Sequence, residues 1–132
     1  MTNEDAITVG MLTGSEILCI GPEATLQDVA VAMGDAGVGS LVVGTQDDVK
    51  GIVSERDVVR AVASGQDFAS LSVGQVASTK LVWADEASPM ADVAMEMTEK
   101  WVRHVLVEKD GRLVGIVSSR DLLGAYAMDG SP

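Results

Sequence analysis

The seven residues GIVSERD (Gly51–Asp57) recur 64 positions later as GIVSSRD (Gly115–Asp121), with Ser119 in place of Glu55. In both copies an apolar triplet typical of a strand leads into a serine, two polar residues and an aspartate. Serine followed three residues later by an acidic residue is a form of capping box at a helix start. A helix start can also hold a phosphate or another acceptor-rich ligand. The surrounding sequence has to decide between these two interpretations.

The repeated phrase belongs to a longer internal repeat. At an offset of 64 residues, 16 of 57 aligned positions are identical and no gap is needed. The stretch TVGMLTG (residues 8–14), for example, falls on SVGQVAS (residues 72–78). A single register held this long indicates duplication. We therefore predict two domains, residues 8–64 and residues 72–128, with a short linker at about residues 66–71.

Each repeat predicts the order strand, helix, strand, strand, helix. In the first repeat Thr25 is expected to cap the first helix, with Asp28 in the first turn. In the second repeat Ser88 is the expected cap and Pro89 the expected first helical residue. The expected strands are EILCI, VGSLVVG and VKGIVS, then KLVWA, VRHVLVE and LVGIVS, and the closing helices are ERDVVRAVASG and SRDLLGAYAM.

Composition limits the class of protein. Hydrophobic residues make up 47% of the 132-residue chain and aromatic residues only 3%, which predicts an aliphatic core. The formal net charge of −11 argues against nucleic-acid binding through a basic face and against binding to anionic membranes. No stretch is apolar for the roughly 18 residues of a membrane span, and the acidic amino terminus is unlike a secretory signal, so we expect a cytoplasmic protein. The lone Cys19, in the apolar run ILCI, is expected to be buried.

Taken together, these features resemble a free-standing tandem pair of cystathionine-β-synthase-type (CBS) domains, over about residues 8–128. The resemblance rests on the element order, the tandem repeat, the lead-in TVGMLTG, the strand VRHVLV and the closing phrase in both copies. It implies a mixed α/β fold (α+β type), with two β-α-β-β-α repeats packed about a pseudo-two-fold axis. It also implies two clefts that bind adenine nucleotides or adenosyl compounds (AMP, ADP, ATP or S-adenosylmethionine), regulation of a partner protein, and homodimers formed through helices.

The resemblance assigns ligand contacts to particular residues. The aspartate of each phrase would hold the ribose, the serine would contact phosphate or ribose, and the neighbouring arginine would supply positive charge. The family often uses a basic pair in this strand for phosphates, here Arg103 and His104 of VRHVLV, which as neighbours in a strand are expected to face opposite sides. Apolar residues of the first strand of each repeat would line the adenine pocket, with Trp83 able to stack on the base. The expected ligand-binding residues are Ser54, Arg56, Asp57, Ser118, Arg120, Asp121, Arg103, His104, Ile17, Leu18, Val82 and Trp83.

The two repeats differ at the basic pair. Gly39 and Ser40 occupy the positions of Arg103 and His104 in the first repeat, so the two clefts are not expected to be equivalent. His104 could also be an ordinary half-buried histidine. With one histidine and one cysteine in the chain, we expect no zinc site. Trp101 could belong to the core or to a dimer surface.

Three classes of function remain open to different degrees. The leading hypothesis is a regulatory module with a reversible adenine-nucleotide ligand, no covalent cofactor and an unidentified partner protein. The alternative is a structural dimerisation module with vestigial pockets. We find no phosphate-binding P-loop and no paired nucleophile and base, so an enzyme is not expected.

Overall fold

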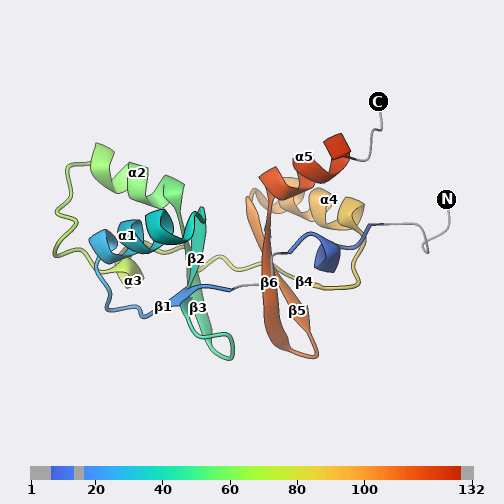
Figure 1. Cartoon of the computed structure of the whole chain (residues 1–132), viewed down its shortest axis with the longest axis horizontal. Coiled ribbons are helices and arrows are strands. Elements are labelled where there is room, and N and C mark those ends of the chain that lie inside the picture. Colours follow the sequence, from blue (N-terminus) through green and yellow to red (C-terminus); the bar gives the residue numbers. More distant parts are fainter. Residues whose placement is uncertain (1–6, 14–16, 129–132) are drawn as a thin grey trace. The chain divides into compact units, whose positions relative to one another are not determined.

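The computed structural model describes residues 7–13 and 17–128, which form two three-stranded sheets with helices (Figure 1). The predicted mixed α/β order of strand, helix, strand, strand, helix is confirmed in both repeats. None of the described helices is long and apolar enough to cross a membrane. The elements are η2 (Val9–Met11), β1 (Cys19–Ile20), α1 (Leu26–Ala36), β2 (Ser40–Gly44), β3 (Val49–Ser54), α2 (Glu55–Ala63), α3 (Val73–Val76), β4 (Trp83–Asp85), α4 (Met90–Lys100), β5 (His104–Lys109), β6 (Arg112–Ser118) and α5 (Ser119–Met128).

The two sheets have the same topology. β1 pairs parallel with β2, and β2 pairs antiparallel with β3. In the second sheet β4 pairs parallel with β5, and β5 pairs antiparallel with β6. The β5–β6 hairpin turns at Asp110 and Gly111, whose φ angles are +53° and +80°. Two positive φ angles are typical of the tight hairpin turn that the Asp-Gly pair predicts.

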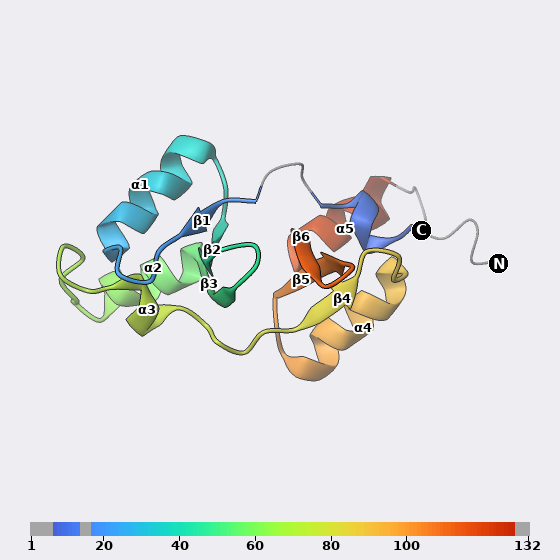
Figure 2. The same ribbon diagram turned by 90° about the horizontal axis from the view of Figure 1, so that it is seen from below.

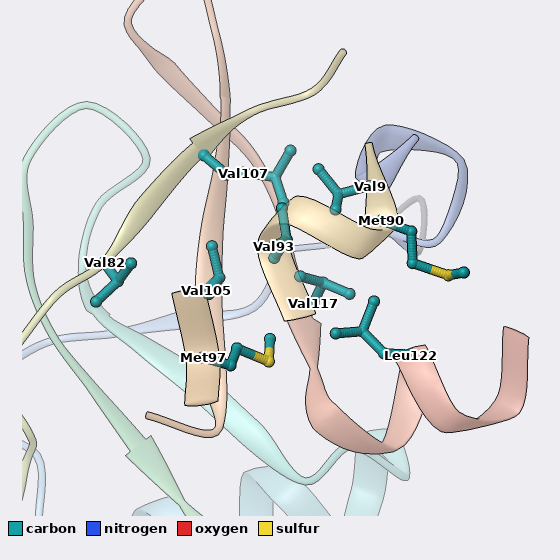
Figure 3. Packing of buried hydrophobic residues seen from close by; sticks show 10 residues of the cluster. Val9, Val82, Met90, Val93, Met97, Val105, Val107, Val117 and Leu122 are labelled. Atoms are coloured by element: carbon teal, nitrogen blue, oxygen red, sulfur yellow. The ribbon is translucent and has the colours of Figure 1, made fainter. Parts of the chain in front are cut away.

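Each sheet packs one face against its own helices, and both cores are aliphatic, as predicted. In the first, buried side chains of α1 and α2 meet alternate residues of β2 and β3, such as Leu41, Val43 and Val53. Strand residues two apart point to the same face, so this face is uniformly apolar. The second core combines α4, α5 and alternate strand residues (Figure 3); it contains Val9, Val82, Ala84, Met90, Val93, Met97, Val105, Val107, Val117 and Leu122.

The lead-in of each repeat packs onto the other repeat's sheet and helices. One compact unit spans residues 17–81, and the other joins residues 82–128 to the lead-in at residues 7–13 (Figure 2). Val9 is fully buried in the core of this second unit. Its repeat equivalent, Val73 of α3, is fully buried in the core of the other unit. The compact units therefore combine parts of both sequence repeats.

Backbone hydrogen bonds hold the first lead-in in place and shift a predicted helix boundary. The Val9 N–H donates to the Ser88 carbonyl at 2.9 Å, and the Met90 N–H donates to the Ile7 carbonyl at 2.8 Å. Pro89 is extended (φ −61°, ψ 140°) and forms the N-cap, and α4 begins at Met90. The expected cap at Ser88 with Pro89 inside the helix is wrong by one residue, because the lead-in takes the first free amide of α4.

The expected burial of Cys19 is also wrong, since its side chain is exposed. Its neighbours Leu18 and Ile20 pack against the core, and alternation along a strand turns Cys19 to the opposite face. Partial desolvation by surrounding residues still raises the pKa of the thiol. A raised pKa leaves less thiolate at neutral pH, which makes Cys19 a weak nucleophile.

Candidate ligand-binding site

Both copies of the repeated phrase form helix caps. At the start of α5 the Ser118 N–H donates to Asp121 Oδ2 at 2.8 Å, and the Asp121 N–H donates to Ser118 Oγ at 3.1 Å. At the start of α2 the Ser54 N–H donates to Asp57 Oδ2 at 2.8 Å, and the Ser54 hydroxyl donates to the same oxygen at 3.1 Å. The capping interpretation is confirmed, and capping holds each aspartate side chain at the N-terminus of its helix.

Capping leaves acceptor capacity on both aspartates. The hydrogen bonds that the two carboxylates accept all use Oδ2, and among the described residues Oδ1 of Asp57 and of Asp121 has no hydrogen-bond partner. Asp121 is exposed and Asp57 half-buried. A carboxylate oxygen in this position can accept from a sugar hydroxyl while the other oxygen caps the helix. Capping and ligand binding are therefore compatible uses of the same side chain.

The helix starts offer few free amides for an anion. The Ser119 N–H donates to the Arg103 carbonyl at 2.9 Å, and the Asp121 N–H is used by the cap. The Glu55 N–H likewise donates to the Gly39 carbonyl at 3.0 Å. An anion near α5 would therefore depend on cationic side chains more than on the helix amides, and Arg120 is exposed in the first turn.

The structure brings the basic pair of the second repeat to this helix start. His104 is the cross-strand partner of Ser118, so the two side chains lie on one face of the sheet. Arg103, exposed, is held beside Ser119 by the backbone bond just described. In the first repeat Ser40 pairs with Ser54 in the same way. The two repeats share this geometry and differ in charge.

Trp83 lies on the same sheet face as His104. It pairs with Leu106, which in turn pairs with Ile116. The residues that alternate with them, such as Ala84, Val105 and Val117, point into the helix-side core. Trp83, Leu106 and Ile116 therefore lie on the sheet face away from the helices. Trp83 is half-buried, which leaves part of the indole available for stacking on a base.

Two of the predicted apolar lining residues have other surroundings, on the helix side of their sheets. Val82 is buried in the helix-side core, and Leu18 packs against the helix-side core of its own unit. Ile17 is half-buried and precedes β1. The sheet face that carries Trp83 and His104 includes neither Val82 nor Leu18.

A groove of about 610 Å³ adjoins the second phrase and involves residues that the sequence did not single out. Arg120 and Asp121 lie on one side of it, and the first lead-in supplies the other. No local signal identifies the lead-in residues, because their proximity depends on which unit a short segment joins. The full lining is Ile7, Met11, Leu12, Arg120, Asp121, Gly124 and Ala125.

Among the described residues no group of three or more His, Cys, Asp or Glu side chains is placed to hold a metal ion.

Trp101 lies outside the core, with 90% of its surface exposed. This excludes the core for Trp101, and its place on a dimer surface stays a prediction.

Comparison with known proteins agrees with this architecture. The chain is 31% identical over 108 residues to hypoxic response protein 1 of Mycobacterium tuberculosis, which covers 80% of this chain and 76% of that protein. It spans 62% of an uncharacterised Methanopyrus kandleri protein that is 27% identical. A CBS domain protein from Pyrobaculum aerophilum, solved in complex with AMP, is 29% identical, with a TM-score of 0.76 and coverage of 92% of this chain and 99% of that one.

A CBS-domain-containing protein from Agrobacterium tumefaciens is 32% identical, with a TM-score of 0.81 and coverage of 91% of this chain and 99% of that one. The CBS domain family itself matches the chain twice, over residues 3–64 and 73–128. The chain belongs to the CBS domain family.

Proposed function

We propose that this protein is a regulatory module that binds an adenine nucleotide or adenosyl compound reversibly. The observation that carries the proposal is the convergence at the start of α5: the free Oδ1 of Asp121, the Ser118 hydroxyl, and the basic pair Arg103 and His104. A carboxylate suits a ribose, and the cations suit a phosphate. The AMP complex of the related Pyrobaculum protein supports this class of ligand.

The same proposal ranks the two repeats. The phrase of the second repeat has two basic neighbours, while Gly39 and Ser40 stand at those places in the first. We expect the second phrase to bind a phosphorylated ligand more tightly. The first phrase, with the uncharged Gly39 and Ser40 beside it, is expected to bind the same ligand more weakly.

We also propose a cytoplasmic homodimer that signals to a partner protein. Exposed apolar side chains recur on the helices of both repeats at the 64-residue offset, which is unusual for a surface that faces only water. The equivalent exposed pairs are Val31 and Met95, Val59 and Leu123, and Val62 and Tyr126. Signalling to a partner further requires that the ligand bind two conformations of the protein with different affinities.

A calorimetric panel tests the binding function. AMP, ADP, ATP, S-adenosylmethionine and, as a non-adenine control, GMP would each be titrated into the purified protein. The proposal expects saturable binding of at least one adenine compound and weaker or absent binding of GMP. Absence of binding across the adenine compounds would leave the structural dimerisation module as the better account.

A further inference from the structure

Trp101 combines two unfavourable features on the surface of the second repeat. Its side chain is 90% exposed, and its backbone is in the left-handed region (φ 58°, ψ 40°) at the C-cap of α4. Glycine is the residue that usually fills such a cap. Its repeat equivalent is indeed a glycine, Gly37, with φ +69°. A large apolar side chain at a strained, exposed position indicates a contact that α4 does not make within its own unit.

The first repeat has a groove at the equivalent place. It lies between α1 and α2 and measures about 540 Å³. A Cβ atom added to Gly34 or Gly37 would meet no atom within 4 Å, so the floor of the groove is open there. In the second repeat Thr98 and Trp101 occupy these two positions. The lining is Ala30, Met33, Gly34, Gly37, Val38, Glu55, Val58 and Val59.

We propose that, in the homodimer of the proposed function, Trp101 of each copy seats in the Gly34/Gly37 groove of the other copy. The helices of the first repeat then face the helices of the partner's second repeat. A two-fold dimer forms every contact twice, so two such contacts close the assembly without unpaired surfaces. Tryptophan is favoured as an interface anchor because one side chain contributes a large apolar area.

Pairing of like repeats satisfies these surfaces less well. It would place groove against groove and Trp101 against Trp101, so the hollow stays unfilled. It would also bring the two Glu55 carboxylates of the grooves together, and like charges repel. In the unlike pairing the Glu55 carboxylate meets the indole N–H, a hydrogen-bond donor that a buried tryptophan needs. Shape and charge therefore both favour unlike pairing.

Complementation between two variants tests the pairing. Trp101→Ala removes the anchor, and Gly34→Gln fills the groove at an open helical position. Each variant alone lacks both seated contacts, so each should dimerise at least tenfold more weakly than wild type in sedimentation experiments. A mixture of the two restores one contact, because the intact groove of the first variant accepts Trp101 of the second. The mixture should therefore associate at least tenfold more tightly than either variant alone.

The control is Ala69→Gln, which adds the same side chain at an exposed loop position outside both grooves and outside the helices, and this variant should dimerise as wild type does. If Gly34→Gln fails to fold, Val59→Arg blocks the groove from an exposed position instead. Mixing that brings no gain over the single variants would overturn the proposed pairing, even if wild type dimerises. A wild-type monomer would overturn the dimer itself, while adenine binding remains a separate calorimetric result.

Discussion

At the scale of single residues, Trp101 is expected to destabilise its own fold. A left-handed backbone costs a non-glycine residue roughly 1–2 kcal/mol, and glycine loses part of this gain through its greater unfolded freedom. In a Gly34→Gln background, which removes the dimer contribution, Trp101→Gly should raise the free energy of unfolding by about 1 kcal/mol. Urea denaturation measures this, with Trp101→Ala as the control that keeps the backbone strain. Equal stability of the Gly and Ala variants would contradict the strain argument.

The repeats differ in charge at Arg103, because its equivalent in the first repeat is the uncharged Gly39. The Arg103 side chain is exposed, and the residue binds the Ser119 N–H through its backbone carbonyl, which alanine also supplies. Arg103→Ala should therefore leave the fold intact and weaken one class of ligand site. Gly39→Arg should strengthen the other class, because a Cβ there meets first the flexible end of Glu55, 2.9 Å away. AMP titrations of both variants measure the effect. Two identical sites that neither change affects would show that the asymmetry has no role in binding.

At the scale of elements, the packing of each lead-in onto the other repeat predicts which strands lose hydrogen-exchange protection when a lead-in residue is mutated. Val9 and Val73 are both fully buried, in different units. Truncating either to alanine should cost roughly 2–3 kcal/mol through lost burial and a small cavity. Val9→Ala should lower hydrogen-exchange protection in β5 and β6, and Val73→Ala should lower it in β2 and β3. Loss of protection in the strands of the mutated residue's own sequence repeat would contradict the packing of each lead-in onto the other repeat.

Local signals explain which elements were predictable. The 64-residue register predicted all six strands and the two helices of each repeat, because these depend on short-range alternation and on caps such as Thr25 with Asp28 at the start of α1. The docking of the lead-ins was not predictable, since a short apolar segment fits either core equally well by pattern. Cys19 was misplaced for a related reason: in an apolar run without polar alternation, the facing of a two-residue strand is not encoded locally.

The candidate site shows the same division. The sequence predicted both capping aspartates, because each lies three residues after the serine of its repeated phrase. The basic pair was assigned from the family resemblance, and the pairing of His104 with Ser118 across the sheet brings it beside the second phrase. It did not predict the contribution of Met11 and Leu12 to the groove beside Arg120, which depends on long-range packing. The assignment of Val82 to a ligand pocket relied on resemblance, and in the structure this side chain is buried in the core.

At the scale of the whole molecule, the net charge of −11 should oppose self-association. Salt screens repulsion between exposed charges over about 10 Å at 0.1 M. The dimer should therefore tighten several-fold between roughly 20 mM and 500 mM NaCl, because apolar helix contacts hold it and charge opposes it. Sedimentation at both salt concentrations measures the change. A dimer that weakens with added salt would indicate that ion pairs, and not the apolar helix faces, hold the two copies together.

Binding by the repeated phrase is tested most directly by calorimetric titration of AMP, or of whichever adenine compound the wild type binds, into Asp121→Asn. Asparagine keeps one oxygen for the helix cap, so the stability of the ligand-free protein should fall by at most about 1 kcal/mol. The lost charge and the lost acceptor should weaken binding about tenfold to a hundredfold, since a hydrogen bond to a charged group contributes roughly 1.5–3 kcal/mol. Asp57→Asn should affect the other site. Unchanged affinity in Asp121→Asn would show that the phrase is a helix cap and nothing more.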